Sequence, residues 1–381
     1  MNQFLKLASD NLLVSTLVVG LGCEIGQGSR TPQAQTAQQD SVSPGEVVPT
    51  GRLSVARAAH TATLLPNGTV LLVGGMGGAG ATAESYDPAR GSFIPAGRMV
   101  SERAGGHAAV LLPTGSVLLT GGWTGPAVTA SAELYDPSTN TFSVAGTMNS
   151  PRSAHTATLL PTGKVLIAGG FDGSRRLESS ELYDPRTGTF TPTGSMAEPR
   201  SEYAAVLFLD GRVLVTGGNR SSGHVLASAE IYDPIIGMFR RIGNMTMIRH
   251  KHAATALRDG KVLIIGGSDA RDGRGRYASA EVFDPTTGTF VAVNAMNAER
   301  FKLPHAVVLL RTGEVLVAGG AERAEVYDPA TNRFRISAGS VGADLSFSTA
   351  TLLRDGRVLI SGGYDSRIQP TTGAWLYRSQ Q

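Results

Sequence analysis

Six glutamates recur at one position of a repeated segment, and an aromatic residue follows each of them two positions later. The pairs are Glu84/Tyr86, Glu133/Tyr135, Glu181/Tyr183, Glu230/Tyr232, Glu281/Phe283 and Glu325/Tyr327. Carboxylates are common general acids and bases. A catalytic site, however, needs one unique arrangement of side chains, whereas residues that recur at the same position of every repeat usually serve packing. We therefore expect these glutamates to be structural.

A second repeated position is rich in histidine. It is occupied by His60, His107, His155, Tyr203, His252, His305 and Ser348. Zinc requires ligand nitrogens about 2.0–2.1 Å away, whereas neighbouring sheets pack about 10 Å apart. We therefore predict no metal site and no other cofactor, and expect these side chains to form hydrogen bonds between repeats. Four arginines lie three residues before this position, and the sequence leaves open whether they line a central channel or pair with the glutamates: Arg57, Arg152, Arg200 and Arg249.

Candidate ligand-binding side chains lie where the repeats differ from one another. They are aromatic residues directly after a Gly-Gly pair and arginines in the loops that follow: Trp123, Phe171, Arg175, Arg220, Arg274, Arg276, Tyr364 and Arg367. Aromatic rings can stack on sugars or anchor a peptide, and arginines pair with anionic groups. Because arginine exceeds acid in these loops, we expect an anionic ligand group. The sequence leaves open that the rings only pack between repeats and that the arginines only keep the loops solvated.

These positions belong to seven repeats, each marked by a Gly-Gly pair. The pairs begin at Gly74, Gly121, Gly169, Gly217, Gly266, Gly319 and Gly362, so the period is 43 to 53 residues. Each repeat is predicted to contain four short strands. The second strand is a continuous apolar run, such as residues 165–168, which is typical of a strand that is covered on both faces. A Gly follows Asn, Thr or Asp in each turn before it, as hairpin turns favour.

The Gly-Gly pairs, the Glu-x-Tyr-Asp-Pro sequences and the period together resemble kelch repeats, the family that includes the central propeller of galactose oxidase and many eukaryotic substrate adaptors. The resemblance covers residues 47–377 and implies an all-β fold, a seven-bladed β-propeller of four-stranded blades. The last repeat lacks its fourth strand, and residues 47–57 align with the fourth strand of the third repeat. An N-terminal strand should therefore complete the last blade and leave no open edge.

The strand order predicts that the loops after the second and fourth strands emerge on one face, here called the loop face. The longest of these loops spans residues 268–279 and includes Asp269, Asp272, Arg274 and Arg276. Variable loops on a rigid scaffold are the usual place for binding. No carboxylate in the repeats stands out as uniquely placed.

The N-terminus has a different composition from the repeats. Residues 1–22 contain Lys6 and a short apolar run, which is typical of an export signal and too short to span a bilayer as a helix. Leu21-Gly22-Cys23 is similar to the end of a bacterial lipobox, which would make Cys23 a lipidation site; an ordinary secretory signal is the alternative. We interpret polar residues 23–44 as a flexible linker and residues 45–381 as the propeller. The expected location is periplasmic, outer-membrane-anchored or extracellular, with membrane contact only through a lipid anchor.

The composition narrows the function. The formal net charge of +3 on 381 residues gives no basic surface that would indicate nucleic-acid binding, and no nucleophile or phosphate-binding motif is present. We expect a non-enzymatic binding module of the cell envelope, with a protein or glycan partner. The resemblance implies two enzymatic alternatives, a sialic-acid-type mutarotase and a copper-radical oxidase. The second requires in that family a cysteine within the catalytic core, and the single cysteine, Cys23, precedes the repeats.

Overall fold

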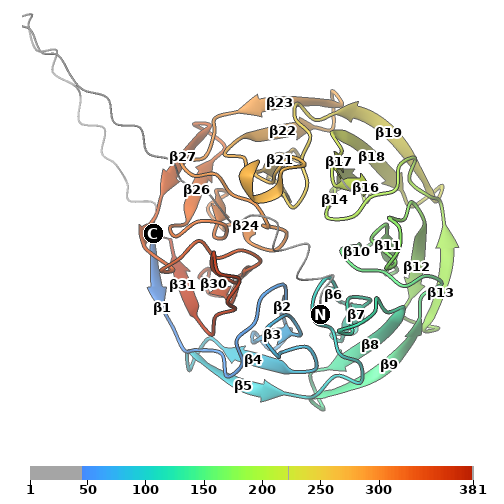
Figure 1. Ribbon diagram of the computed structural model, residues 1–381, viewed down its shortest axis with the longest axis horizontal. Helices are drawn as coiled ribbons and strands as arrows, with labels where there is room; N and C mark the ends of the chain where they lie inside the picture. Colours follow the sequence, from blue (N-terminus) through green and yellow to red (C-terminus); the bar gives the residue numbers. More distant parts are fainter. Residues whose placement is uncertain (1–44, 222, 380–381) are drawn as a thin grey trace, which may run out of the picture. The chain divides into compact units, whose positions relative to one another are not determined.

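In the computed structural model, which describes residues 45–221 and 223–379, antiparallel sheets form seven blades around one axis (Figure 1). Six blades have four strands, and the seventh has five. The all-β, seven-bladed propeller expected from the repeats is confirmed. Within the described residues, no helix is long and apolar enough to cross a membrane.

Strands occupy equivalent places in successive blades. The innermost strands are β2 (Thr61–Leu64), β6 (Ala108–Leu111), β10 (Thr156–Leu159), β14 (Ala204–Leu207), β20 (Ala253–Ala256), β24 (Val307–Leu309) and β29 (Thr349–Leu352). The second strands are β3 (Val70–Val73), β7 (Val117–Thr120), β11 (Val165–Ala168), β15 (Val213–Thr216), β21 (Val262–Ile265), β25 (Val315–Val317) and β30 (Val358–Ser361). The third strands are β4 (Ala83–Asp87), β8 (Ser131–Asp136), β12 (Ser180–Asp184), β18 (Ser228–Asp233), β22 (Ala280–Asp284), β26 (Glu325–Asp328) and β31 (Ala374–Arg378). The outermost strands are β5 (Ser92–Ala96), β9 (Thr141–Thr147), β13 (Thr189–Thr193), β19 (Met238–Asn244), β23 (Thr289–Val293), β27 (Arg333–Ile336) and β1 (Glu46–Pro49).

Three short strands and one turn of helix lie outside this pattern. β16 (Asn219–Ser221) and β17 (His224–Val225) form a small hairpin after β15, and η1 (Asp272–Arg274) lies in the long loop after β21. β28 (Ala338–Gly339) pairs in parallel with β1. The hairpin and η1 both follow a second strand, so they belong to the loop face.

The core consists of the apolar second strands packed between neighbouring blades. Leu71 of β3 belongs to the same buried cluster as Val117 and Leu119 of β7 in the next blade. Every residue of β3, β7, β11, β15, β21 and β30 is buried, as their continuous apolar runs predicted. Burying each Val, Leu or Ile side chain of these strands contributes about 1.5–3 kcal/mol.

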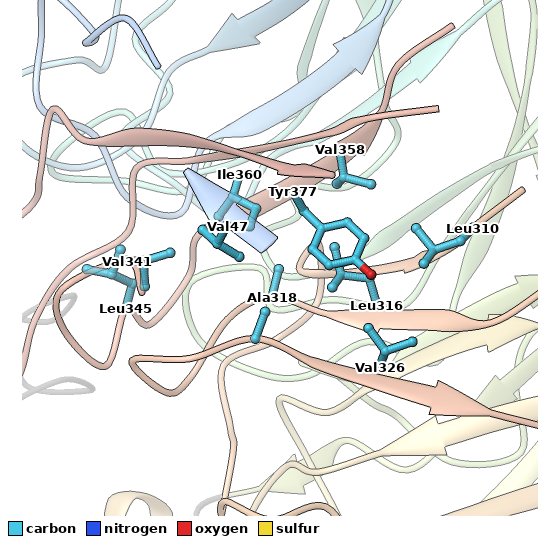
Figure 2. Packing of buried hydrophobic residues seen from close by; sticks show 11 residues of the cluster. Val47, Leu310, Leu316, Ala318, Val326, Val341, Leu345, Val358, Ile360 and Tyr377 are labelled. Carbon is cyan, nitrogen blue, oxygen red and sulfur yellow. The ribbon is translucent and has the colours of Figure 1, made fainter. Parts of the chain in front are cut away.

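The N-terminal strand closes the ring. β1 pairs antiparallel with β31, with Val47 opposite Tyr377. Figure 2 shows Val47 among Val341, Leu345, Ile360 and Tyr377, in the core between the last two blades. The predicted closure by an N-terminal strand is therefore confirmed, and the last blade contributes no free edge at β31.

Buried arginine–glutamate pairs join successive blades. The pairs, with N–O distances of 2.6 to 3.0 Å, are Arg57/Glu84, Arg103/Glu133, Arg152/Glu181, Arg200/Glu230, Arg249/Glu281 and Arg300/Glu325. Each arginine also donates to the carbonyl of the first Gly of a Gly-Gly pair at 2.5 to 2.9 Å. Each glutamate accepts a backbone N–H as well, at 2.7 or 2.8 Å. The structural role expected for the glutamates is confirmed, and the arginines pair with them.

One of the seven junctions between blades lacks this pair. Between the last two blades, Leu345 stands where the other junctions have arginine, and Trp375 stands where they have glutamate. Both side chains pack in the cluster around Val47. An apolar contact thus replaces an ion pair at the junction next to the closing strand.

The Gly-Gly pairs allow the backbone of one blade to approach the next. A Cβ on Gly74, which has φ of 65°, would lie 2.6 Å from the carbonyl oxygen of Arg103, in the segment that connects β5 with β6 of the next blade. No side chain fits at that distance. This close approach, together with the positive φ, explains the repeated glycine.

Candidate functional site

One residue before each innermost strand, two positions before it in six blades and five positions before it in the sixth, contributes to a ring around the axis on the loop face. These seven residues, all with φ between 50° and 68°, are Ala59, Gly106, Ala154, Glu202, Lys251, Lys302 and Phe347. Positive φ is uncommon for residues other than glycine and marks positions that the surrounding structure holds in place. We call these residues the axial ring.

Backbone hydrogen bonds join the axial ring from blade to blade. The N–H of Glu202 donates to the carbonyl of Ala154 at 3.1 Å, and the N–H of Lys251 donates to that of Glu202 at 2.9 Å. The N–H of Phe347 likewise donates to Lys302 at 3.0 Å, and that of Ala59 to Phe347 at 3.1 Å. The ring is therefore a rigid support, because each member is fixed by its neighbours.

The side chains of the axial ring divide it into two halves. Blades one to three contribute only Ala59, Gly106 and Ala154, whereas blades four to seven contribute Glu202, Lys251, Lys302 and Phe347. Packing of identical blades does not require this difference. It marks one sector of the loop face as the candidate site.

Glu202 and Lys251 belong to a buried polar network. Glu202 Oε2 accepts a hydrogen bond from Asn219 Nδ2 at 2.7 Å and lies 3.1 Å from His250 Nδ1. Lys251 Nζ donates to Asp272 Oδ1 at 2.9 Å and lies 3.7 Å from Glu202 Oε1. Two carboxylates, an imidazole and an ammonium thus meet at the axis, although the sequence had shown no uniquely placed carboxylate.

The long loop after β21 supplies Asp272. η1 turns the chain at this point, and Asp272 itself has φ of 52°. Asp272 Oδ1 also lies 3.7 Å from His250 Nε2, which is 3.2 Å from the carbonyl oxygen of Asp269. The loop that the sequence singled out therefore reaches the axial ring, which confirms that loops after second strands and after fourth strands share one face.

The charges of the network stabilise one another. Burial opposes ionisation of Glu202, yet Lys251, His250 and Arg176 hold the pKa of this carboxyl below its usual value. Burial also opposes protonation of Lys251, but Glu202 and Asp272 outweigh it and raise the pKa of the ammonium. Both groups are therefore ionised at neutral pH.

Lys302 has a different environment. Its side chain is 6% exposed, and its Nζ lies 4.6 Å, 5.4 Å and 5.9 Å from the ring centroids of Phe301, Tyr364 and Phe347. Among residues 45–221 and 223–379, no ion pair or hydrogen bond to this ammonium is found. Burial and the neighbouring charge of Lys251 lower the pKa of Lys302 to about 8.

Two of the predicted ligand-binding residues, Tyr364 and Arg276, lie in this sector. Tyr364 is 4% exposed and borders Lys302. Arg276 lies over the ring of Phe301 at 4.8 Å, with Nη1 3.9 Å from Asp344. These two residues belong to the candidate site.

The remaining predicted residues lie elsewhere on the loop face. Trp123 is 5% exposed, and its ring centroid is 6.2 Å from that of the half-buried Phe171, so these two rings pack on each other. The exposed arginines are Arg175, Arg220, Arg274 and Arg367. Arg175 pairs with Asp172 at 3.6 Å, and Arg220 pairs with Glu198 at 3.7 Å. The arginines therefore do not converge on one ligand.

Sequence reasoning did not identify Glu202, His250, Lys251 or Lys302. A signal was present, because Glu202, Lys251 and Lys302 each stand two residues after a repeat arginine, where the first and third repeats have alanine. Charged residues at a position where other repeats have alanine therefore distinguish the site. The sequence does not show which of these residues lie close together, because that depends on how the blades are arranged around the axis.

The repeated histidines do form hydrogen bonds between blades, as expected. Nε2 of His107 lies 3.2 Å from Thr61 Oγ1, and Nε2 of His155 lies 2.8 Å from Thr120 Oγ1. Burial lowers the pKa of both to about 3, so they are neutral at physiological pH. His305 departs from this pattern, because among the described residues its imidazole makes no such hydrogen bond. Within the described residues, no group of three His, Cys, Asp or Glu side chains is arranged to hold a metal ion.

A pocket of about 240 Å³ lies away from the axis, between the seventh and first blades, and Ser54, Glu84 and Arg98 are among its lining residues. Glu84 already pairs with Arg57 at 2.6 Å and accepts the N–H of Ser54 at 2.8 Å. The carboxylate of the pocket is therefore already paired, and its other charged side chain, that of Arg98, is exposed. We place the candidate site at the axial ring.

Comparison with known proteins agrees with the blade pattern. The family model of the Kelch motif matches residues 104–149, 152–197 and 249–297, which correspond to the second, third and fifth blades. Three of the seven blades thus match the Kelch motif. No curated protein matches it by sequence.

Solved structures include similar propellers. A fungal alcohol oxidase of the AA5 family, in complex with copper, matches this chain with a TM-score of 0.70 at 17% sequence identity, over 88% of this chain and 76% of that chain. At this identity the likeness concerns the fold alone. The predicted export signal (residues 1–22), the lipidation site Cys23 and the linker (residues 23–44) lie outside the described residues.

Proposed function

We propose that this kelch-repeat propeller is a non-enzymatic binding module of the cell envelope, and that its loop face holds a protein or glycan ligand with an anionic group. The observation that carries the proposal is the asymmetry of the axial ring, in which charged and aromatic side chains fill one sector and alanine and glycine the other. Rigid backbone and converging polar groups are typical of a preformed binding site.

The charge of the sector supports an anionic ligand group. Lys302 has no carboxylate partner among the described residues. Arg276 has an acidic neighbour, Asp344, but the two groups are 3.9 Å apart and the Asp344 side chain is 55% exposed. A carboxylate or sulfate that approaches the ring would therefore meet cations that are incompletely neutralised.

A thermal-shift experiment on the full-length protein tests the proposal. The probes are N-acetylneuraminate, galacturonate, a neutral sugar such as galactose, and divalent metal ions. Binding to the folded state should raise the melting temperature in a dose-dependent way. We expect a shift with an acidic sugar, which Arg276→Ala abolishes and Arg274→Ala, an exposed residue of the same loop, leaves unchanged. Equal effects of the two substitutions would place the ligand elsewhere.

A sugar-acting enzyme, such as a sialic-acid-type mutarotase, is the second candidate. The observation in its favour is the contact of Glu202 with His250 at 3.1 Å, because a carboxylate–imidazole pair can transfer protons. Anomer exchange of N-acetylneuraminate, followed by NMR, distinguishes the two functions. A rate enhancement that Glu202→Gln removes would favour the enzyme, whereas binding without enhancement would favour the module.

The described residues contain no group of three His, Cys, Asp or Glu side chains arranged to hold a metal ion, and we derive no step through copper for this chain.

A further inference from the structure

Lys302 differs from the other described lysines in what surrounds its ammonium. Nζ of Lys164, Lys251 and Lys261 each lies 2.9 to 3.6 Å from an aspartate oxygen. Nζ of Lys302 instead faces the rings of Phe301, Phe347 and Tyr364, at 4.6 to 5.9 Å from their centroids. Three aromatic rings exclude water from this ammonium and provide no anion to neutralise it.

Charged groups from the neighbouring blades also act on Lys302. Lys251 and Arg276 disfavour its protonated form, whereas Asp272 and Glu202 favour it, and burial is the largest influence. The result is a pKa of about 8 in place of the usual 10.5. A lysine that is desolvated by apolar groups and lies near another cation is the type of amine that acts as a nucleophile in proteins.

The backbone holds Lys302 in place. Its φ is 59°, and its carbonyl accepts the N–H of Phe347 at 3.0 Å as part of the axial ring. The amine is therefore presented on a fixed support at the axis, between Lys251 and Phe347 of the neighbouring blades. The half of the ring that carries only Ala59, Gly106 and Ala154 adds no charged or bulky side chain at the axis.

We propose that Lys302 is a nucleophilic amine that binds an aldehyde or ketone ligand covalently and reversibly as an imine. The neutral amine attacks the carbonyl carbon, and the C=O π electrons move to oxygen. A proton then passes from nitrogen to oxygen, for which the carboxylates of Asp272 and Glu202 are the neighbouring proton carriers, to give a carbinolamine. Loss of water forms the C=N bond, and addition of water reverses the step, so no oxidant or reductant is needed.

This inference goes beyond the proposed binding function and is independent of it. An anionic ligand could bind at Arg276 without forming an imine, and an imine could form at Lys302 with a neutral carbonyl compound. The thermal-shift experiment tests the first, and chemical labelling tests the second.

The test is competitive labelling of the full-length protein with formaldehyde and cyanoborohydride, which converts each imine into a methylated amine. Peptide mass spectrometry measures the rate at Lys302 and, in the same sample, at the exposed lysines Lys164 and Lys261. A pKa lower by more than two units increases the neutral fraction at pH 7 on the order of 100-fold. Because the rings limit access, we expect a rate at Lys302 at least about 10-fold higher than at Lys164 and Lys261.

The pH dependence provides a second, independent measurement. Labelling of Lys302 should level off above about pH 8, whereas labelling of Lys164 and Lys261 should continue to rise towards pH 10. Lys302→Arg keeps the charge, cannot form this imine, and should lose the fast label without changing the rates at the other two lysines. A rate at Lys302 equal to or below that of the exposed lysines at pH 7 would overturn the proposal, as would a fast label that persists in Lys302→Arg.

Discussion

At the scale of single residues, the arginine–glutamate pairs show how a repeated polar position stabilises the ring. Arg249 and Glu281 are fully buried, 2.8 Å apart, and each satisfies backbone groups as well. Replacing both members of a buried ion pair by apolar residues of similar size changes the free energy of unfolding little, but removing one member leaves a buried charge without a partner. Each pair is therefore needed as a unit.

Glu281→Gln should lower the free energy of unfolding by about 3–5 kcal/mol, because Arg249 would remain buried without its counter-charge. Denaturant unfolding, followed by fluorescence, measures the loss. Glu178→Gln, which removes a carboxylate from an exposed position of the third repeat, is the matched control and should change stability by less than about 0.5 kcal/mol. Similar losses in the two variants would contradict the structural role of the pairs.

Removing the charge of Lys302 should increase the free energy of unfolding, in contrast to removing that of Glu281. Because its folded-state pKa of about 8 is below the usual 10.5, the unfolded state binds more protons between these two values, and the contribution of Lys302 becomes less unfavourable as the pH rises through that range. Lys302→Met should therefore stabilise the protein by about 1–3 kcal/mol at pH 7, with the gain lost by about pH 10.5. Unfolding measurements at pH 7, 9 and 10.5 follow this change.

Lys251→Met is the control for that experiment. The pKa of Lys251 is raised by Glu202 and Asp272, so its removal should destabilise the protein at pH 7. If Lys302→Met instead behaved like Lys251→Met, the ammonium of Lys302 would have an anionic partner in solution, which the surrounding rings do not provide.

At the scale of elements, β1 provides the closure on which the ring depends. It supplies Val47, which is 3% exposed, and four pairings with β31. Deleting residues 45–55 from the full-length chain should sharply lower the melting temperature, because β31 would become an open edge and the core beside Leu345 would lose a side chain. An equally long deletion within residues 24–44 is the control. An unchanged melting temperature after the first deletion would contradict closure by β1.

A point substitution tests the same element without shortening the chain. Val47→Asp places a carboxylate in the apolar cluster between the last two blades. Its effect should approach that of the deletion, since an unpaired buried charge costs several kcal/mol. Val48→Asp, on the alternate, half-buried side of the strand, should cost less.

At the scale of the whole molecule, the sequence predicted what is repeated and missed most of what is unique. Gly-Gly pairs and Glu-x-Tyr sequences occur in nearly every blade, so the fold, the blade count and the closing strand could be derived from them. The site could not, because Glu202, Lys302 and Asp272 come from different blades and become neighbours only when the ring closes. Tyr364 and Arg276 were identified because they lie in variable loops, which are conspicuous in a repeat protein.

The attachment of the propeller to the cell is the remaining prediction at this scale. If Cys23 is acylated after removal of residues 1–22, the acyl chains would hold the protein at a membrane, since each buried CH₂ contributes about 0.8 kcal/mol. In a bacterial host, the wild-type protein should incorporate radiolabelled palmitate and sediment with membranes, whereas Cys23→Ala should do neither. Ser29→Ala, in the same polar segment, should behave as the wild type. Palmitate label that persists in Cys23→Ala, or a wild-type protein without label, would contradict lipidation at Cys23 and favour an ordinary secretory signal, in which case the loop face would meet its ligand free of the membrane.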